Sequence, residues 1–251
     1  MRVIITGAAG KIGTEIVEEL SSRHELCLID QTPVRGRKSI VADLAQRRCR
    51  SYRRPWLKTR TPRWMTLFEG VDVVLHLAAN IESWAPSWDK ILPNNIEATW
   101  NVFEAAARYR APRVIFASSN WAVKALEKRM APECYLANGA KISSDAAPAP
   151  LTIYGLSKAF GELAGRMLVD EGKINSFVAV RIGHYNSEPS SDGELRARWI
   201  GRQDIRSLFR KCVEAEFTGF HVVYGVSGQS TAPYDLSYTK RLFGWEPKQS
   251  A

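Results

Sequence analysis

The sequence lacks long hydrophobic runs and close pairs of cysteine. No run of about 18 apolar residues occurs in the 251 residues, so no membrane span is expected. A β-branched run begins at residue 2, which leaves no room for a signal peptide. The four cysteines are scattered and lack metal-ligand spacing. This pattern predicts reduced thiols, no metal site and a cytoplasmic location.

Acidic residues are also absent from residues 46–64, a stretch that carries eight lysines and arginines. The formal net charge is +9, so the rest of the chain carries only +1. Basic residues interleaved with Tyr52, Trp56 and Trp64 can bind nucleic acid or another polyanion. A solvated surface insertion explains the same composition, and we favour that interpretation. No nucleic-acid partner is therefore expected.

Three glycines mark a change from strand to helix near the start of the chain. The run Arg2–Ile5 is β-branched, as in a buried strand, and apolar residues with helical spacing follow from Ile12. Between them lie Gly7, Gly10 and Gly13. Such a turn bends sharply and lets a pyrophosphate approach the amides at the helix N-terminus. The stretch therefore predicts a dinucleotide site.

The second expected strand, Leu26–Ile29, ends at Asp30. An acid at this place accepts hydrogen bonds from the adenosine ribose hydroxyls and repels a 2′-phosphate. The cofactor predicted is therefore NAD. Arg35 and Arg37 follow closely and offer the alternative of holding a 2′-phosphate.

Strand and helix patterns alternate along the rest of the chain. Further strands are expected at 39–42, 71–77, 114–117, 177–181 and 221–223. Long helices are expected at 87–110, kinked at Pro93, and at 152–170. The order predicts an α/β fold with a doubly wound parallel sheet, the Rossmann fold. We expect one domain over residues 1–251, with residues 184–251 contributing most of a small substrate-binding annex.

Tyr154 and Lys158 are four residues apart and so share one face of a helix. A cation beside a phenol favours the phenolate, which can exchange a proton with a substrate hydroxyl. The strand at 114–117 brings Ser119 to the sheet edge where ligands bind, and its hydroxyl can hold the same substrate oxygen. The three residues predict a proton relay.

Together these motifs resemble the extended short-chain dehydrogenases/reductases, the NAD-dependent epimerase/dehydratase group. The matching pieces are TGAAGKIG, the strand ends at Asp30 and Asp43, HLAA at 76–79, NNIEATWNVFEAA at 94–106, FASSN at 116–120, YGLSK at 154–158 and RIG at 181–183. They cover nearly the whole chain in order.

The resemblance implies roles for particular residues. The catalytic set would be Ser119, Tyr154 and Lys158. The cofactor would be bound by Gly7, Gly10, Lys11, Ile12, Gly13, Asp30, Asp43, Leu44, Leu77, Ala78, Ala79, Asn95, Ser118, Tyr154, Lys158 and Ile182. The substrate would be bound by Asn80, Ser119, Asn120, Tyr154, His184 and Arg196. A homodimer paired through the helices at 87–110 and 152–170 is also implied.

Within that family the chain is most similar to the uronate dehydrogenases, which oxidise the anomeric carbon of a free hexuronate to a lactone. The similarity includes RARWIGRQD at 196–204 and HVVYGVSG at 221–228. By this resemblance, Arg196 or Arg198 would hold the uronate carboxylate.

The departures from those enzymes fall at positions expected to face the substrate. Trp121 and His184 stand where they carry histidine and serine, and the segment 119–154 is longer than theirs. The basic stretch 46–64 has no counterpart. Trp84, Trp88 and Trp121 are candidates for stacking on a sugar or for packing between helices.

Three functions remain open. An NAD-dependent oxidoreductase acting on a small sugar such as a hexuronate is the one we favour. A nucleotide-sugar epimerase or dehydratase uses the same hydride chemistry, but only 70 residues follow Arg181 to cover a large substrate, and Asn120 and Trp121 stand where dehydratases carry an acidic pair. A non-catalytic NAD-binding or RNA-associated protein would not need the relay.

Overall fold

The computed structural model describes residues 1–46 and 61–251. In these residues seven parallel strands form one sheet in the order β3-β2-β1-β4-β5-β6-β9. The strands are β1 (Arg2–Thr6), β2 (Glu25–Asp30), β3 (Ile40–Val41), β4 (Val73–His76), β5 (Arg113–Ser119), β6 (Ser176–Ile182) and β9 (Gly219–Gly225). A separate parallel pair joins β7 (His184–Tyr185) to β8 (Trp199–Ile200). The predicted doubly wound sheet is confirmed.

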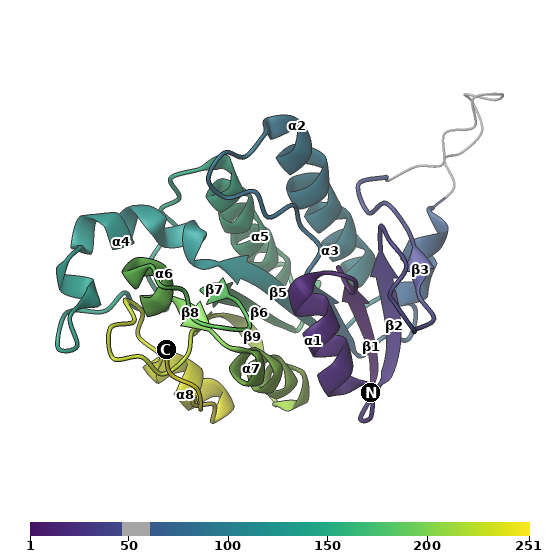
Figure 1. The fold of residues 1–251 in the computed structure, drawn as a ribbon. Helices are drawn as coiled ribbons and strands as arrows, with labels where there is room; N and C mark the ends of the chain where they lie inside the picture. The colour runs from purple at the N-terminus through teal and green to yellow at the C-terminus, as the bar shows by residue number, and fades with distance from the viewer. Residues whose placement is uncertain (47–60) are drawn as a thin grey trace.

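Helices cover both faces of the large sheet (Figure 1). The α-helices are α1 (Lys11–Leu20), α2 (Trp88–Ile91), α3 (Ala98–Arg108), α4 (Lys124–Met130), α5 (Ile153–Asp170), α6 (Gly193–Ala197), α7 (Arg202–Glu214) and α8 (Ser237–Phe243). Short turns of other helix types are η1 (Arg63–Phe68), η2 (Leu92–Glu97), η3 (Asn120–Val123) and η4 (Glu133–Tyr135). Helices α1 and α7 lie on one face, and α3 and α5 lie on the other (Figure 1).

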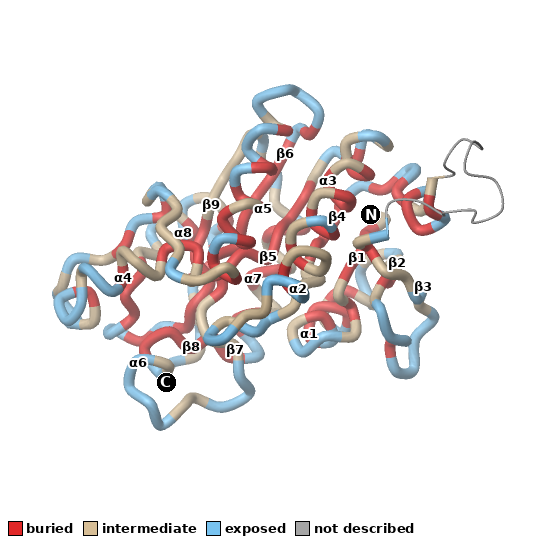
Figure 2. Tube along the Cα trace, turned by 90° about the horizontal axis from the view of Figure 1, so that it is seen from above, coloured by how far each residue is buried: buried red, intermediate tan, exposed pale blue. Residues whose placement is uncertain are grey.

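The sheet is buried on both faces because successive side chains of a strand point to opposite layers. In β1, Val3 and Ile5 belong to the core beneath α1 and α7, whereas Ile4 belongs to the core beneath α3 and α5. Figure 2 shows the central strands as a buried band under the more exposed helices. The near-continuous apolar run of β1 follows from this double burial.

The helix expected at 87–110 is broken into three pieces. A π-helical turn, η2, separates α2 from α3 and carries Pro93 near its start. Proline lacks the amide hydrogen that an α-helix needs at an interior position, so the ladder of hydrogen bonds widens there. At Pro93, where the sequence predicts a kink or a restart of the helix, the structure has a change of helix type.

Ion pairs join α1 to α7, two helices that lie far apart in the sequence. Glu15 pairs with Arg202 at 3.0 Å and with Arg206 at 2.6 Å. Glu19 pairs with Arg210 at 2.8 Å. These contacts line up the two helices beneath the same core, where Ile16 and Phe209 are both fully buried.

The described residues also bear on three expectations about the whole chain. None of their helices has the length and apolar character needed to cross a membrane. Cys27, Cys134 and Cys212 are free thiols. Residues 47–60 of the basic stretch lie outside the described residues, so its role stays a prediction. Its last residue, Trp64, is buried in the core beneath α3.

Candidate functional site

A cavity of about 780 Å³ lies at the carboxyl ends of β1, β4 and β5. This is the edge at which an open parallel sheet binds ligands, and β1 lies where the order of strands reverses. Residues of the glycine turn line one end, and residues around His184 and Arg198 line the other. We refer to these as the cofactor end and the substrate end.

The glycine turn leaves no room for a side chain at Gly7 or Gly13. Gly7 has φ +73°, and a β-carbon there would lie 2.5 Å from the amide nitrogen of Ala78. A β-carbon on Gly13 would lie 2.1 Å from the carbonyl oxygen of Gly7. Helix α1 begins at Lys11, and no side chain caps its first amides. Bare amides at a helix N-terminus suit a pyrophosphate, so this end of the cavity fits NAD.

Asp30 ends β2 and lines the cofactor end. Its Oδ2 accepts a hydrogen bond from the amide of Ala9 at 2.9 Å, and its Oδ1 accepts one from the amide of Thr32 at 3.1 Å. The carboxylate therefore braces the glycine turn while it faces the cavity. Arg37 turns toward α1, where it contacts Glu18 at 3.7 Å, and neither it nor Arg35 is among the residues lining the cavity.

Two residues expected to bind the cofactor stand beside the cavity wall. Asp43 is not a lining residue, and its Oδ1 accepts a hydrogen bond from the amide of Ala45 at 3.0 Å. Asn95 is buried, accepts a hydrogen bond from the amide of Asn80 at 2.7 Å, and donates one to Ser157 at 3.0 Å. It thus fixes Asn80, which does line the cavity. The other residues expected at the cofactor all line it: Gly7, Gly10, Lys11, Ile12, Gly13, Asp30, Leu44, Leu77, Ala78, Ala79, Ser118, Tyr154, Lys158 and Ile182.

The three residues of the predicted relay meet between the two ends of the cavity. Ser119 ends β5, while Tyr154 and Lys158 lie in the first turns of α5, where Thr152 accepts a hydrogen bond from the amide of Gly155 at 3.2 Å. A β-carbon on Gly155 would lie 2.4 Å from the carbonyl oxygen of Trp121. The phenol of Tyr154 has the side chain of Ser119 as its hydrogen-bond partner, and both residues line the cavity.

Burial shifts the pKa of Tyr154 in the direction opposite to the one expected from sequence. Desolvation raises the pKa of Tyr154 to about 12, although the hydrogen bond with Ser119 lowers it. Desolvation also lowers the pKa of Lys158 to about 7, so its positive charge is partial at neutral pH. Its Nζ donates to the carbonyl of Ala117 at 2.8 Å and lies 5.8 Å from the centre of the Tyr154 ring. The expectation that Lys158 lowers the pKa of Tyr154 below its ordinary value is wrong in this structure, because desolvation dominates.

At the substrate end, Asn80, Asn120 and His184 line the cavity as expected. Burial lowers the pKa of His184, with Arg198 as the next cause, so its ring is neutral at pH 7. The structure decides between the two candidate arginines: Arg198 lines the cavity, whereas Arg196 is exposed and is not a lining residue. Arg196 lies in the last turn of the short helix α6 and outside the cavity, which contradicts its expected place in the site.

Two tryptophans stand at the mouth of the substrate end. Trp84 is 72% exposed, and its ring packs edge-on against Trp121 with the centroids 4.8 Å apart. Trp121 in turn lies edge-on to Tyr154 at 6.5 Å. Both tryptophans line the cavity, so they face the space next to the relay.

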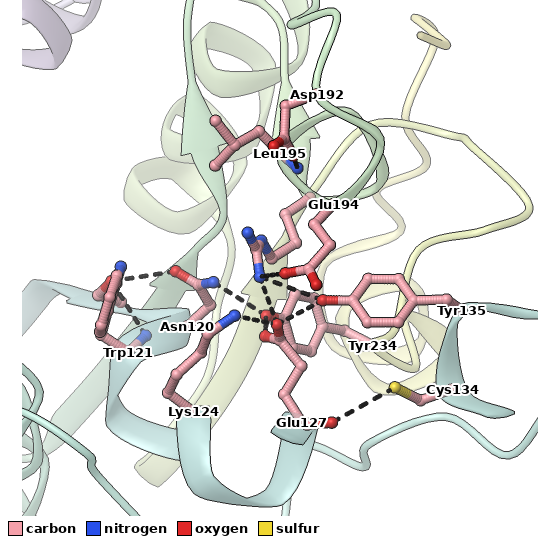
Figure 3. A network of polar contacts seen from close by, with 12 residues as sticks. Asn120, Trp121, Lys124, Glu127, Cys134, Tyr135, Asp192, Glu194, Leu195 and Tyr234 are labelled. Carbon is pink, nitrogen blue, oxygen red and sulfur yellow. Dashed lines mark hydrogen bonds and ion pairs between the residues drawn. The ribbon is translucent and has the colours of Figure 1, made fainter. Parts of the chain in front are cut away.

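A buried polar cluster that the sequence did not reveal stands behind this wall (Figure 3). We call it the Glu127 cluster, and its members are Lys124, Glu127, Tyr135, Glu194, Arg198 and Tyr234. Figure 3 shows the side chains of Lys124, Tyr135 and Tyr234 converging on the carboxylate of Glu127. Asn120 of the cavity wall donates a hydrogen bond to the Tyr234 hydroxyl at 2.9 Å. The extra length of segment 119–154, which supplies three of the members, was the one available signal.

Comparison with known proteins gives consistent matches. The family model "NAD dependent epimerase/dehydratase family" matches residues 3–207. An NAD-dependent glucose-6-phosphate dehydrogenase of Haloferax volcanii is 30% identical over 99% of this chain and 94% of that protein. An L-arabinose 1-dehydrogenase of the same organism is 28% identical over 100% of this chain and 97% of that protein. The crystal structure of uronate dehydrogenase from Agrobacterium tumefaciens has a TM-score of 0.80 and 29% identity, and the match covers 100% of this chain and 85% of that chain.

Proposed function

The chain belongs to the NAD-dependent epimerase/dehydratase family, as its motifs predicted, and we propose that it oxidises the anomeric hydroxyl of a small sugar with NAD. It is an NAD-dependent oxidoreductase of the extended short-chain dehydrogenase group. The observation that carries the proposal is the meeting of Ser119 and Tyr154 in the cavity that the glycine turn also lines. Its relatives named for glucose 6-phosphate, arabinose and uronate share the reaction class and differ in the sugar.

Three residues of the chain would act in the oxidation of the substrate hydroxyl. NAD held at the cofactor end by the glycine turn and Asp30 would supply the acceptor for the hydride that leaves the substrate carbon. Tyr154, in the phenolate form that it reaches as the pH rises, takes the proton from the substrate hydroxyl and becomes a neutral phenol, while the hydroxyl of Ser119 holds the same oxygen. Lys158 orients the nicotinamide ribose. The carbon loses a hydride and its oxygen loses a proton, so a ring sugar leaves as a lactone.

A substrate panel tests this function. The protein is mixed with NAD and, separately, with free aldoses, hexuronates, sugar phosphates and nucleotide sugars, and the absorbance of NADH is followed. We expect NADH to accumulate in step with a lactone from at least one monosaccharide. Isomerisation of a sugar without accumulation of NADH would show that the relay serves an epimerase instead.

We also propose that two copies of the chain pair through α5 and the neighbouring helices α2 and α3. Helix α5 exposes Leu156, Leu163 and Met167, which share one face of the helix. Light scattering of the purified protein should give twice the chain mass, and Leu163→Glu should give the mass of one chain because it places a charge on that apolar face. A single-chain mass for the unmodified protein would contradict the pairing.

A further inference from the structure

Arg198 is the arginine on the wall of the substrate end, and it is already engaged. Its side chain is only 4% exposed. Its Nη1 contacts the carboxylate of Glu127, the hydroxyl of Tyr135 at 3.1 Å and the carboxylate of Glu194 at 3.4 Å. A guanidinium on a cavity wall is the group that usually recognises a carboxylate or phosphate. Here the chain supplies the carboxylates itself.

Glu127 is the more important of the two partners because it is buried. Its side chain is 2% exposed, compared with 66% for Glu194. Besides Arg198, its oxygens accept hydrogen bonds from Lys124, Tyr135 and Tyr234. Four donors therefore hold this carboxylate, and a ligand would have to break several charge-assisted hydrogen bonds to displace it.

The electrostatics of the Glu127 cluster keep the pair ionised. Burial alone would raise the pKa of Glu127, but the charge of Arg198 and the hydrogen bonds from Lys124 and the tyrosines hold it below its ordinary value. Burial opposes the charge of Arg198, but Glu127 together with Tyr135 and Tyr234 more than offsets it, so the pKa of Arg198 is raised. Two cations and two carboxylates make the formal charge of the cluster zero.

The other cations lining the described cavity stand elsewhere. Lys11 begins α1 beside the glycine turn, and Lys158 belongs to the relay. His184 is neutral at pH 7 because burial lowers its pKa. Within the described residues, the wall of the substrate end therefore offers an anion no cation that lacks a carboxylate partner.

We infer that the substrate is an uncharged sugar, an aldose, rather than a hexuronate or a sugar phosphate. The inference rests on the proposed function and narrows its substrate. A substrate carboxylate beside Arg198 would meet two carboxylates that already contact Nη1, and it would have to shed its water against their negative charge. An aldose has only hydroxyl groups to satisfy, which Asn80, Asn120 and the Trp84–Trp121 pair can contact.

The first test uses the unmodified protein with matched sugars. Glucose, glucuronate and glucose 6-phosphate are compared with NAD, and galactose is compared with galacturonate. Within each set we expect kcat/KM for the neutral sugar to exceed that for the anionic sugar by at least about tenfold, the worth of one charge-assisted contact. A higher kcat/KM for the anion overturns the inference and leaves the proposed function standing. Absence of NADH with every sugar overturns the proposed function.

The second test removes the internal carboxylate. Glu127→Gln keeps the size of the side chain and removes the buried one of the two carboxylates that contact Arg198, so kcat/KM for glucuronate relative to glucose should rise at least about tenfold. Glu133→Gln is the matched control, because Glu133 is an exposed glutamate six residues along the same segment. NAD affinity and circular dichroism show whether each variant is folded. An unchanged ratio in a folded Glu127→Gln protein overturns the inference.

Removing one partner of a buried ion pair is costly, and the design therefore provides for a Glu127→Gln protein that does not fold. A binding measurement then replaces it: the melting temperature of the unmodified protein with NADH is compared in glucose and in glucuronate at equal concentrations. A ligand that binds the folded state raises this temperature. A rise with glucose only supports the inference, and an equal or larger rise with glucuronate overturns it.

Discussion

The two ends of the cavity position their polar groups by different means. At the cofactor end, the turn between Gly7 and Gly13 and the carboxylate of Asp30 come from one strand–helix–strand unit. At the substrate end, Glu127 contacts Arg198 and Tyr234, which lie 71 and 107 residues away in the chain. One end depends on backbone shape within a short stretch, and the other depends on side chains that distant segments bring together.

This difference determines how each end responds to mutation. A backbone site depends on close approach, so an added methyl group damages it and most neighbouring changes do not. A cluster of charged side chains tolerates small changes of shape, but one uncharged substitution alters the balance of charge. The cofactor end should therefore preserve its ligand, while the substrate end can change its preference among sugars.

The largest effect is expected at Tyr154, which lies between the two ends, because its substitution should lower turnover and leave NAD binding intact. Tyr154→Phe keeps the ring and deletes the hydroxyl, so turnover should fall by ~10²–10⁴, the usual worth of a positioned acid–base group. NAD affinity, measured by calorimetry, should hardly change. Because burial raises the pKa of Tyr154 to about 12, turnover of the unmodified enzyme should rise with pH above neutrality. A variant that keeps most of its activity would remove Tyr154 from the mechanism.

The dependence of the cofactor end on backbone shape can be broken at Gly13. The β-carbon of Gly13→Ala would lie 2.1 Å from the Gly7 carbonyl oxygen. We expect a cost of about 1–3 kcal/mol, the usual price of overpacking, seen as weaker NAD binding or a lower melting temperature. Gly193→Ala is the control, since nothing lies within 4 Å of the added carbon. Equal effects of the two changes would argue against a tightly built turn.

A buried histidine beneath the cofactor end should make stability depend on pH. His76 lies between the hydroxyls of Thr6 at 2.6 Å and Thr99 at 3.0 Å, and burial lowers its pKa to about 3. The unfolded chain binds the proton near pH 6.5 and the native chain does not, so stability is complete above about pH 6.5 and is lost as the pH falls toward 3. Between pH 7 and pH 5, this residue alone should lower the free energy of unfolding by about 2 kcal/mol.

Urea unfolding at both pH values measures that loss. His76→Gln removes the titrating group, so its unfolding free energy should fall less between pH 7 and 5 than that of the unmodified protein. An identical fall in both proteins would mean that other groups account for the pH dependence.

The smallest effect is expected for the choice between NAD and NADP. Asp30→Asn keeps an acceptor for the amide of Ala9 and removes the negative charge. The preference for NAD, measured as the ratio of kcat/KM values, should narrow by about tenfold, equivalent to ~1.4 kcal/mol. Neutralising Arg37 should not alter the ratio, because Arg37 turns toward Glu18. If neutralising Arg37 changed the ratio and Asp30→Asn did not, the preference between NAD and NADP would depend on the arginines.

The same contrast explains how much the sequence could predict. The sheet, the glycine turn and the relay were predicted because each depends on spacing within a few residues, as between Tyr154 and Lys158. The Glu127 cluster was not predicted, because nothing near Glu127 in the sequence indicates that it meets Arg198. The direction predicted for the pKa of Tyr154 was wrong for a related reason, because burial is a property of the whole fold. That residues 184–251 supply most of a substrate annex stays a prediction.

The pairing of α1 with α7 has a consequence for how the protein is made. Helix α1 is complete at Leu20, but Arg202, Arg206 and Arg210, which pair with its glutamates, are synthesised far later. Until then the apolar side of α1 lacks the cover that α7 provides, which exposes it to chaperones and to other nascent chains. A chain that ends before residue 202 therefore contains the glycine turn but lacks α7, so the core beneath α1 stays exposed.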